Sequence, residues 1–290
     1  MTDLRGPPDD RSVDDLLSFG VVNLDKPPGP SAHQVAAWVR DMTDVERAAH
    51  AGTLDPKVTG CLPTLLGDAT RMAQVFLEGT KEYVSVLELH GPVPSDFDAV
   101  VAEFEGEVYQ KPPRKSAVSR RLRSREVYDL DVLEVRDRQA LLRIRCESGT
   151  YVRKLCHDIG LAAGTGAHMG HLRRTATDPF DDTSLSTLYD LSDALAFAEE
   201  GDESVLREVV APAERALSHL PHVTIAYSAA EQVAEGAPVY APGVFDADDA
   251  DRGSLVACVT PDDAAVCLGH LVGDPDADSG EVVSLERVLI

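Results

Sequence analysis

The chain has 290 residues, 43% of them apolar, with 27 basic and 50 acidic side chains and a formal net charge of −23. This composition is typical of a globular protein with one large domain, or a large and a small one, and it excludes a wholly disordered chain. No stretch approaches the roughly 20 consecutive apolar residues of a membrane-spanning helix, and the polar N-terminus is unlike a secretory signal, so we expect a cytoplasmic protein without membrane contact.

The first part of the chain interleaves a strand and a helix. Residues 1–18 are polar and rich in aspartate, and we expect a loose tail there. An apolar run at residues 21–24 predicts a strand, and the prolines after it predict a turn. Ser31 is a suitable N-cap for a helix whose apolar stripe consists of Val35, Trp38, Val39 and Met42.

Two further strands and a second helix follow. Residues 83–89 and 142–146 are rich in β-forming residues that alternate at least in part with polar ones, which predicts strands. A turn at Ser148 and Gly149 leads into a helix with the apolar stripe Val152, Leu155, Cys156 and Ile159. This interleaving predicts an α+β domain with a mixed central sheet and flanking helices.

The composition changes near residue 220. A helical pattern at residues 185–219 ends at Leu220 and Pro221, and the remainder has short apolar runs between turns. Residues 222–290 therefore predict a small separate β-domain. We divide the chain into a tail of residues 1–18, a domain of residues 19–221 and a domain of residues 222–290.

The acidic surface has one basic exception. Only six of the basic residues are lysines and the acids form clusters, which indicates adaptation to a very salty cytoplasm, where self-repulsion is screened. Residues 111–125 have no acid and seven bases, which are Lys111, Arg114, Lys115, Arg120, Arg121, Arg123 and Arg125. A solvated loop would explain them, but against this background we favour a segment that contacts phosphates.

The sequence predicts neither a metal nor a cofactor. His168 and His171 have the spacing of ligands on one helical turn, but an H-E-x-x-H motif and paired cysteines are both missing. A P-loop and a complete dinucleotide-binding glycine motif are missing too. The odd number of cysteines argues against a disulfide framework, and we expect reduced, mostly buried thiols at Cys61, Cys146, Cys156, Cys258 and Cys267.

The most informative stretch is the G-T-L-D-P sequence at residues 52–56. Proline after Asp55 favours an extended backbone that projects the carboxylate out of a glycine-flanked turn. Together with N-L-D-K-P-P-G at residues 23–29, this stretch resembles the signature motifs of the TruB family of pseudouridine synthases. In that family the aspartate of G-T-L-D-P is the catalytic nucleophile, a role the resemblance gives to Asp55.

The resemblance covers about residues 19–290. Residues 81–84, 148–153 and 166–174 are similar to the family's tyrosine, arginine and leucine-arginine motifs, and residues 235–244 are similar to a PUA domain, an RNA-binding β-barrel. V-Y-Q-K-P-P at residues 108–113 resembles the archaeal and eukaryotic dyskerin branch. One departure is Ser31 and Ala32, which stand where the family usually has threonine and serine.

The resemblance assigns roles to further residues. Arg153 would pair with Asp55 and keep it ionised, unless it is only an exposed helix cation. Tyr83 would stack on the extruded uracil and take part in a proton transfer, unless it is a core aromatic. His50 would hold the gap left by the flipped base, and Leu172 would line the uracil pocket; the plain alternatives are a loop residue and ordinary core.

The reaction needs a placed carboxylate and no cofactor, since an N–C bond breaks and a C–C bond forms with the same base. Asp55 could attack C1′ of the sugar, add to C6 of the base, or assist glycal formation, and the sequence leaves all three open. The resemblance places Lys26 with His50 and Leu172 among the substrate-binding residues, where it would support the Asp55 loop. The plain alternative is a salt bridge to Asp25.

The resemblance also implies partners. Members of this branch act on uridine 55 in the TΨC arm of tRNA, or on guide-selected ribosomal RNA with an H/ACA guide RNA. The other archaeal H/ACA proteins are a small zinc-ribbon protein, a glycine- and arginine-rich protein and a kink-turn-binding ribosomal-type protein. A catalytically idle RNA-binding scaffold is the alternative, although it would not need Asp55, Tyr83 and Arg153 together.

Overall fold

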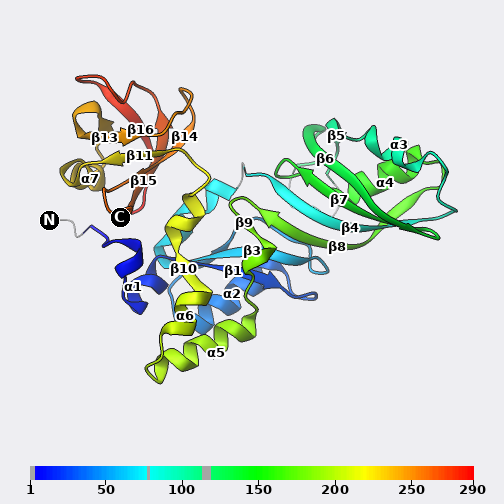
Figure 1. The fold of residues 1–290 in the computed structure, drawn as a ribbon, viewed down its shortest axis with the longest axis horizontal. Coiled ribbons are helices and arrows are strands. Elements are labelled where there is room, and N and C mark those ends of the chain that lie inside the picture. Colours follow the sequence, from blue (N-terminus) through cyan, green and yellow to red (C-terminus); the bar gives the residue numbers. More distant parts are fainter. Residues whose placement is uncertain (1–3, 77–78, 113–118) are drawn as a thin grey trace.

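Figure 1 shows the fold in this computed structural model, which describes residues 4–76, 79–112 and 119–290. A ten-stranded sheet forms the larger part, with the order β10-β1-β3-β8-β4-β7-β6-β5, β2 beside β3 and β9 beside β8. The sheet is mixed because β3 and β8 pair in parallel, whereas β8 and β4 pair antiparallel. The predicted α+β architecture with a mixed sheet is confirmed.

The strands of the large sheet are β1 (Gly20–Lys26), β2 (Ala48–His50), β3 (Thr59–Leu66), β4 (Lys81–Leu89), β5 (Gly106–Gln110), β6 (Arg123–Arg136), β7 (Gln139–Cys146), β8 (Ala167–Thr177), β9 (Phe180–Asp181) and β10 (Val210–Pro212). The three predicted strands correspond to β1, β4 and β7. The central strand β3 is buried from Gly60 to Leu66, which agrees with its lack of charged residues.

Helices gather at both ends of this sheet (Figure 1). Near β1 and β10 lie α1 (Val13–Ser18), α2 (Ala32–Thr43), α5 (Leu188–Glu199) and α6 (Ser204–Val209), and near β5 to β7 lie α3 (Phe97–Ala102) and α4 (Val152–Ala162). Short 3-10 helices cover Pro8–Asp10, Gly67–Phe76, Asp182–Ser184, Ala213–Leu217 and Ala241–Gly243. The Ser31 hydroxyl caps α2 as predicted, since it accepts a hydrogen bond from the Gln34 amide.

The six-stranded C-terminal sheet has the order β12-β16-β15-β14-β11-β13. Its elements are β11 (His222–Ile225), α7 (Tyr227–Ala234), β12 (Val239–Tyr240), β13 (Val244–Ala247), β14 (Leu255–Val259), β15 (Ala265–Leu271) and β16 (Glu281–Val288). One apolar cluster joins both sheets, because Phe19 and Leu217 share it with Ala257 and Leu268. All five cysteines are free and buried, as predicted.

Residues 4–18 correct the expectation of a loose tail. Leu16 of α1 is buried in the main core, and Arg11 forms two hydrogen bonds with the Glu214 carboxylate, of 2.8 and 2.6 Å. Arg5 and Arg11 both stack on the Phe19 ring. These contacts join residues far apart in the chain, so the local polarity of the segment gave no sign of them.

Two helix predictions also need correction. Trp38 of α2 is 40% exposed, because residues 38 and 39 point about 100° apart on a helix and it is Val39 that is buried. The pattern at residues 185–219 is not one helix: α5 ends before Gly201, where φ is +96°, and β10 pairs with β1. Pairing with an existing strand outweighs the helical pattern there.

Candidate active site

Asp55 lies on the loop that joins β2 to β3. The loop turns tightly because the Val58 amide donates a 2.9 Å hydrogen bond to the Asp55 carbonyl. Leu54 and Val58 are buried in the core on either side, whereas the Asp55 side chain is 49% exposed. Two apolar anchors therefore hold a carboxylate at the surface of the molecule.

The Asp55 carboxylate forms an ion pair with Arg153, which stands in the first turn of α4. The two residues that the sequence paired are thus brought together, and both side chains are about half exposed. Charge-assisted pairing favours the ionised form of a carboxylate. Asp55 is therefore available as an anion beside a cation.

The start of α4 is fixed by a residue that the sequence did not single out. The Gln110 side chain, at the end of β5, accepts a 2.8 Å hydrogen bond from the Tyr151 amide and donates one of 3.3 Å to the Tyr151 carbonyl. Gln110 is buried, so both bonds are shielded from water. Because α4 carries Arg153, Gln110 helps to set the position of the Asp55 partner.

Lys26 is fully buried at the end of β1, beneath the Asp55 loop. Its ammonium group donates to the carbonyls of Pro27, Pro56 and Val58, over 2.8, 3.0 and 2.9 Å. Three donors with three acceptors leave none for a substrate, which corrects the expectation that Lys26 binds substrate. It supports the loop. Asp25 pairs instead with Arg173, at 2.9 Å.

Tyr83 in β4 stands opposite Arg174 in β8. Its ring packs against the main core, which includes Leu54 and Leu172. Burial raises the pKa of the Tyr83 phenol, although the charge of Arg174 and its hydrogen bond to the phenol act in the opposite direction. The phenol is therefore a proton donor rather than an anion at neutral pH.

His50 lies at the end of β2 and faces a second histidine. Its Nε2 is 3.4 Å from Nδ1 of His33, and the two rings meet edge to face. Burial, with the nearby charges of His33 and Arg174, lowers the pKa of His50 to about 4. The imidazole is therefore neutral at physiological pH. Leu172 is almost fully buried in the main core.

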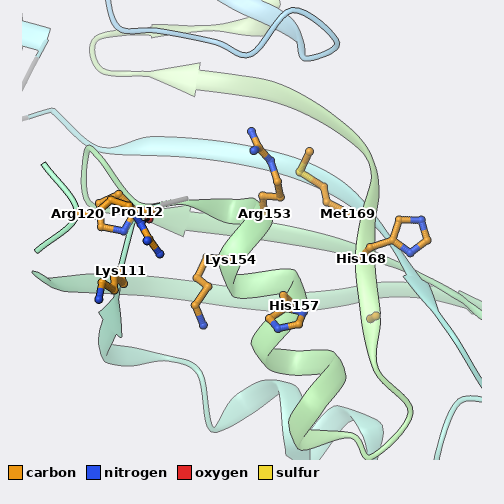
Figure 2. A pocket seen from close by; sticks show the side chains of 9 residues that line it. Lys111, Pro112, Arg120, Arg153, Lys154, His157, His168 and Met169 are labelled. Carbon is orange, nitrogen blue, oxygen red and sulfur yellow. Dashed lines mark hydrogen bonds between the residues drawn. The ribbon is translucent and has the colours of Figure 1, made fainter. Parts of the chain in front are cut away.

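A cavity of about 710 Å³ opens beside Arg153 and is rich in basic side chains. In Figure 2, Lys111, Pro112 and Arg120 lie on one side of the cavity and β8 on the other, with α4 between them. Its lining residues are Lys111, Pro112, Arg120, Arg153, Lys154, His157, Ala167, His168 and Met169.

The predicted RNA-contacting residues fall into three groups. Lys111 and Arg120 line this cavity. Arg121 is exposed and Arg123 half-buried, while Arg125 pairs with Glu147 at 3.2 Å. Two predicted residues lie outside the described residues, namely Arg114 and Lys115.

His168 and His171 lie on a strand and not on a helix, opposite Glu88 and Val86 of β4, with a β-bulge between them. His168 faces His90, with Nδ1 and Nε2 3.1 Å apart. Within residues 4–76, 79–112 and 119–290, no three histidine, cysteine or acidic side chains come together as a metal site would require.

Family models match nearly the whole chain. The N-terminal domain of TruB family pseudouridylate synthase matches residues 40–96 and 92–152, and the C-terminal domain of tRNA pseudouridylate synthase B matches residues 153–218. The chain belongs to the TruB family. A DKCLD domain model also matches residues 5–36 and a PUA domain model residues 221–285. The match at residues 5–36 includes most of the segment expected to be a tail.

Relatives of this TruB family member include halophile proteins. A "Probable tRNA pseudouridine synthase B" of Haloarcula marismortui is 70% identical, over 99% of this chain and 94% of the relative. One of the same name from Halobacterium salinarum is 66% identical, over 99% of each. These relatives agree with the salt adaptation inferred from the charge.

Solved structures give the same assignment. A Cbf5-Nop10-Gar1 complex contains a chain of 46% identity that superimposes with a TM-score of 0.93, covering 100% of this chain and 91% of the other. An H/ACA RNP bound to a substrate RNA containing 2'-deoxyuridine contains one of 44% identity, with a TM-score of 0.92 and the same coverage. In the part of this TruB family chain that the structure describes, no helix is long and apolar enough to cross a membrane.

Proposed function

We propose that Asp55 is the nucleophile with which this pseudouridine synthase isomerises uridine in RNA. The observation that supports the proposal is the ion pair between Asp55 and Arg153 at the surface of a family member. The motif resemblance gives Asp55 the position of the family's nucleophile. Lys26 holds the loop from below, and Tyr83, half-buried, packs against the core cluster that contains Leu54, the neighbour of Asp55.

The reaction breaks the N1–C1′ bond of uridine, turns the base and joins C5 to C1′. The proton on C5 is then lost and N1 gains one, so no electrons enter or leave. As nucleophile, Asp55 bonds to C1′ while the N1–C1′ pair leaves with the base, and this new bond breaks, returning its pair to the carboxylate, when C5 bonds to C1′. Arg153 pairs with the carboxylate, and Tyr83, with its protonated phenol, takes part in the proton transfer.

The target uridine has to leave its stack, at a cost of a few kcal/mol. We propose that His50 occupies the gap and that Leu172 lines the uracil pocket. The RNA backbone follows the basic cavity beside Arg153, where Lys111 and Arg120 contact phosphates. Arg121 and Arg123 extend this path along the start of β6.

The substrate and its assembly follow from the relatives. We propose that the chain works as the catalytic subunit of an H/ACA-type particle, with proteins of the Nop10 and Gar1 kind and a kink-turn-binding protein, and that it also modifies tRNA. The first proposal rests on the likeness to the chains of the two complexes, and the second on the names of the halophile relatives. Such a particle works in the cytoplasm.

Tritium release from uridine labelled at C5 tests these proposals, because that hydrogen is lost in the reaction. The full chain is assayed in molar KCl with labelled tRNA and with a guide-paired ribosomal RNA fragment, each with and without guide RNA and partner proteins. Release from tRNA by the protein alone supports a stand-alone tRNA enzyme, and release only with guide and partners supports the particle. Release from neither would leave an RNA-binding scaffold.

The role of Asp55 needs a matched control. Asp55→Asn should abolish release and leave RNA affinity nearly unchanged. Asp131→Asn removes another exposed aspartate paired with an arginine, at 2.7 Å from Arg143, and should leave release unchanged. If Asp55→Asn loses RNA binding and folding as well, Asp55 is a structural residue and the proposal is wrong.

A further inference from the structure

Arg174 is among the largest side chains that are fully buried in the described residues, with 1% of its surface exposed. It lies in β8 between two strands, opposite Tyr83 of β4 on one side and Gly60 of β3 on the other. A buried guanidinium is unfavourable unless its donors find acceptors. The acceptors that surround the Arg174 guanidinium therefore indicate its structural role.

Those partners belong to the Asp55 loop. Nε of Arg174 donates a 2.7 Å hydrogen bond to the Cys61 carbonyl, and one Nη lies 3.4 Å from the carbonyls of Ala51 and Gly52. The other Nη would lie 3.5 Å from a Cβ added at Gly52. The guanidinium thus spans both ends of the loop that carries Asp55.

No carboxylate pairs with Arg174 in the described part of the chain, in contrast with its neighbour Arg173, which pairs with Asp25. Its charge therefore acts on the groups around it. It lowers the pKa of Tyr83 against the effect of burial, and it contributes to the lowered pKa of His50. The other groups that act on Tyr83 are two buried thiols, Cys146 of β7 and Cys61 of β3.

We propose that Arg174 is a positioning residue of the active site, which fixes the Tyr83 phenol and the Asp55 loop relative to each other. The inference rests on the proposed function, because it gives the tyrosine and the aspartate one common support. One rigid planar group that donates to β3 and to the start of the loop, from a position opposite Tyr83 of β4, suits this task better than a lysine, whose ammonium is a single point. A displacement of a reacting group by about 1 Å can slow the chemical step by about 100-fold.

The test is a double-mutant cycle between Arg174 and Tyr83, read out as single-turnover tritium release in the complete complex. Arg174→Gln and Arg174→Lys should each slow release by about 100-fold while RNA affinity stays within about threefold. A double variant that combines Tyr83→Phe with either Arg174 substitution should release tritium only slightly more slowly than the slower of its two single variants. The reason is that both substitutions act on the same phenol. Losses that multiply would overturn the proposal.

A spectroscopic measurement separates positioning from packing. The ζ-carbon resonance of Tyr83, assigned by comparison with Tyr83→Phe, reports the hydrogen bonding of the phenol. It should move in Arg174→Lys and stay in place in Arg173→Lys, which alters the adjacent arginine of the same strand. An unmoved resonance in Arg174→Lys would overturn the proposal, and because lysine keeps the buried charge, this variant decides the matter if Arg174→Gln does not fold.

The proposed function can fail separately. If Asp55→Asn is active, the nucleophile assignment is wrong whatever Arg174 does. If Asp55→Asn is inactive and the Arg174 variants release tritium at the unaltered rate, only the positioning role is wrong.

Discussion

Nζ of Lys26 lies 3.0 Å from the carbonyl oxygen of Pro56, the residue that follows Asp55. With the bonds to Pro27 and Val58, this contact ties the turn after β1 to the Asp55 loop. The Asp55 loop is thus held by a fully buried lysine rather than by its own sequence alone.

We expect Lys26→Met to disturb this loop, because methionine keeps much of the apolar stem and removes the three donors. Carbonyls left without partners should lower the free energy of unfolding by roughly 1–3 kcal/mol, and tritium release should slow more than RNA affinity falls. Urea denaturation at constant KCl measures the first effect. Lys57→Met, at an exposed position of the same loop, is the control, and equal effects of both variants would contradict a specific role for Lys26.

Gly60 allows β3 to approach β8. A Cβ at this position would lie 2.1 Å from the Arg174 carbonyl oxygen, and φ is +97°. Gly106 has a similar φ of +91° but nothing within 4 Å of an added Cβ. Gly60→Ala should therefore destabilise the fold by roughly 1–3 kcal/mol more than Gly106→Ala, since only the first adds a backbone clash to the strained φ. Equal denaturation midpoints would show that the two strands can separate at little cost.

The sequence correctly predicted that two site residues are neighbours, and both of them belong to short sequence motifs. Asp55 and Arg153 could be paired from the sequence because each stands in a motif that a known family shares. The helix that contains Arg153 followed from its apolar stripe, whereas Asp55 lies on the loop between β2 and β3, two strands that the sequence did not predict.

The contacts that escaped prediction belong to buried polar residues. Gln110, Arg174 and Arg11 carry no local signal, because a polar side chain in a sequence is normally exposed. Their burial depends on carbonyls and carboxylates that lie far away in the chain, such as Glu214 for Arg11. Only the assembled fold brings those acceptors within reach.

His50 should make stability depend on pH in a defined range. Its pKa is about 4 in the folded protein and 6.5 by its ordinary value. Between these values the unfolded chain binds a proton at His50 that the folded protein does not. The free energy of unfolding should therefore fall as the pH is lowered from about 6.5 toward about 4, and this contribution is fully present above that range.

The measurement is urea denaturation across this pH range at fixed KCl. His50→Gln should flatten part of the pH dependence. His171→Gln, which removes an exposed imidazole of β8, should leave the slope unchanged. A slope that is the same in the unaltered protein and in His50→Gln would mean that His50 is protonated equally in both states.

RNA binding should depend only weakly on salt at the concentrations to which this acidic protein is adapted. Several of its basic side chains already have partners within the protein. Arg125 pairs with Glu147, Lys154 pairs with Asp158, and Arg120 donates to the Pro112 carbonyl. These groups are therefore less available to bind phosphates. We therefore expect base stacking, guide pairing and protein partners to contribute more to affinity than phosphate contacts.

Each phosphate contact to a single strand changes log K by about −0.7 per unit of log salt, so raising KCl from about 1 to about 3 M costs roughly twofold per contact. The four proposed contacts, by Lys111, Arg120, Arg121 and Arg123, give a loss of about 20-fold at most, which is the upper limit we expect in equilibrium binding of the complete complex. Arg121→Gln, at an exposed position, should reduce the slope by one contact or less. A loss near 100-fold would require about six contacts, and the basic segment would then be the main source of affinity even in molar salt.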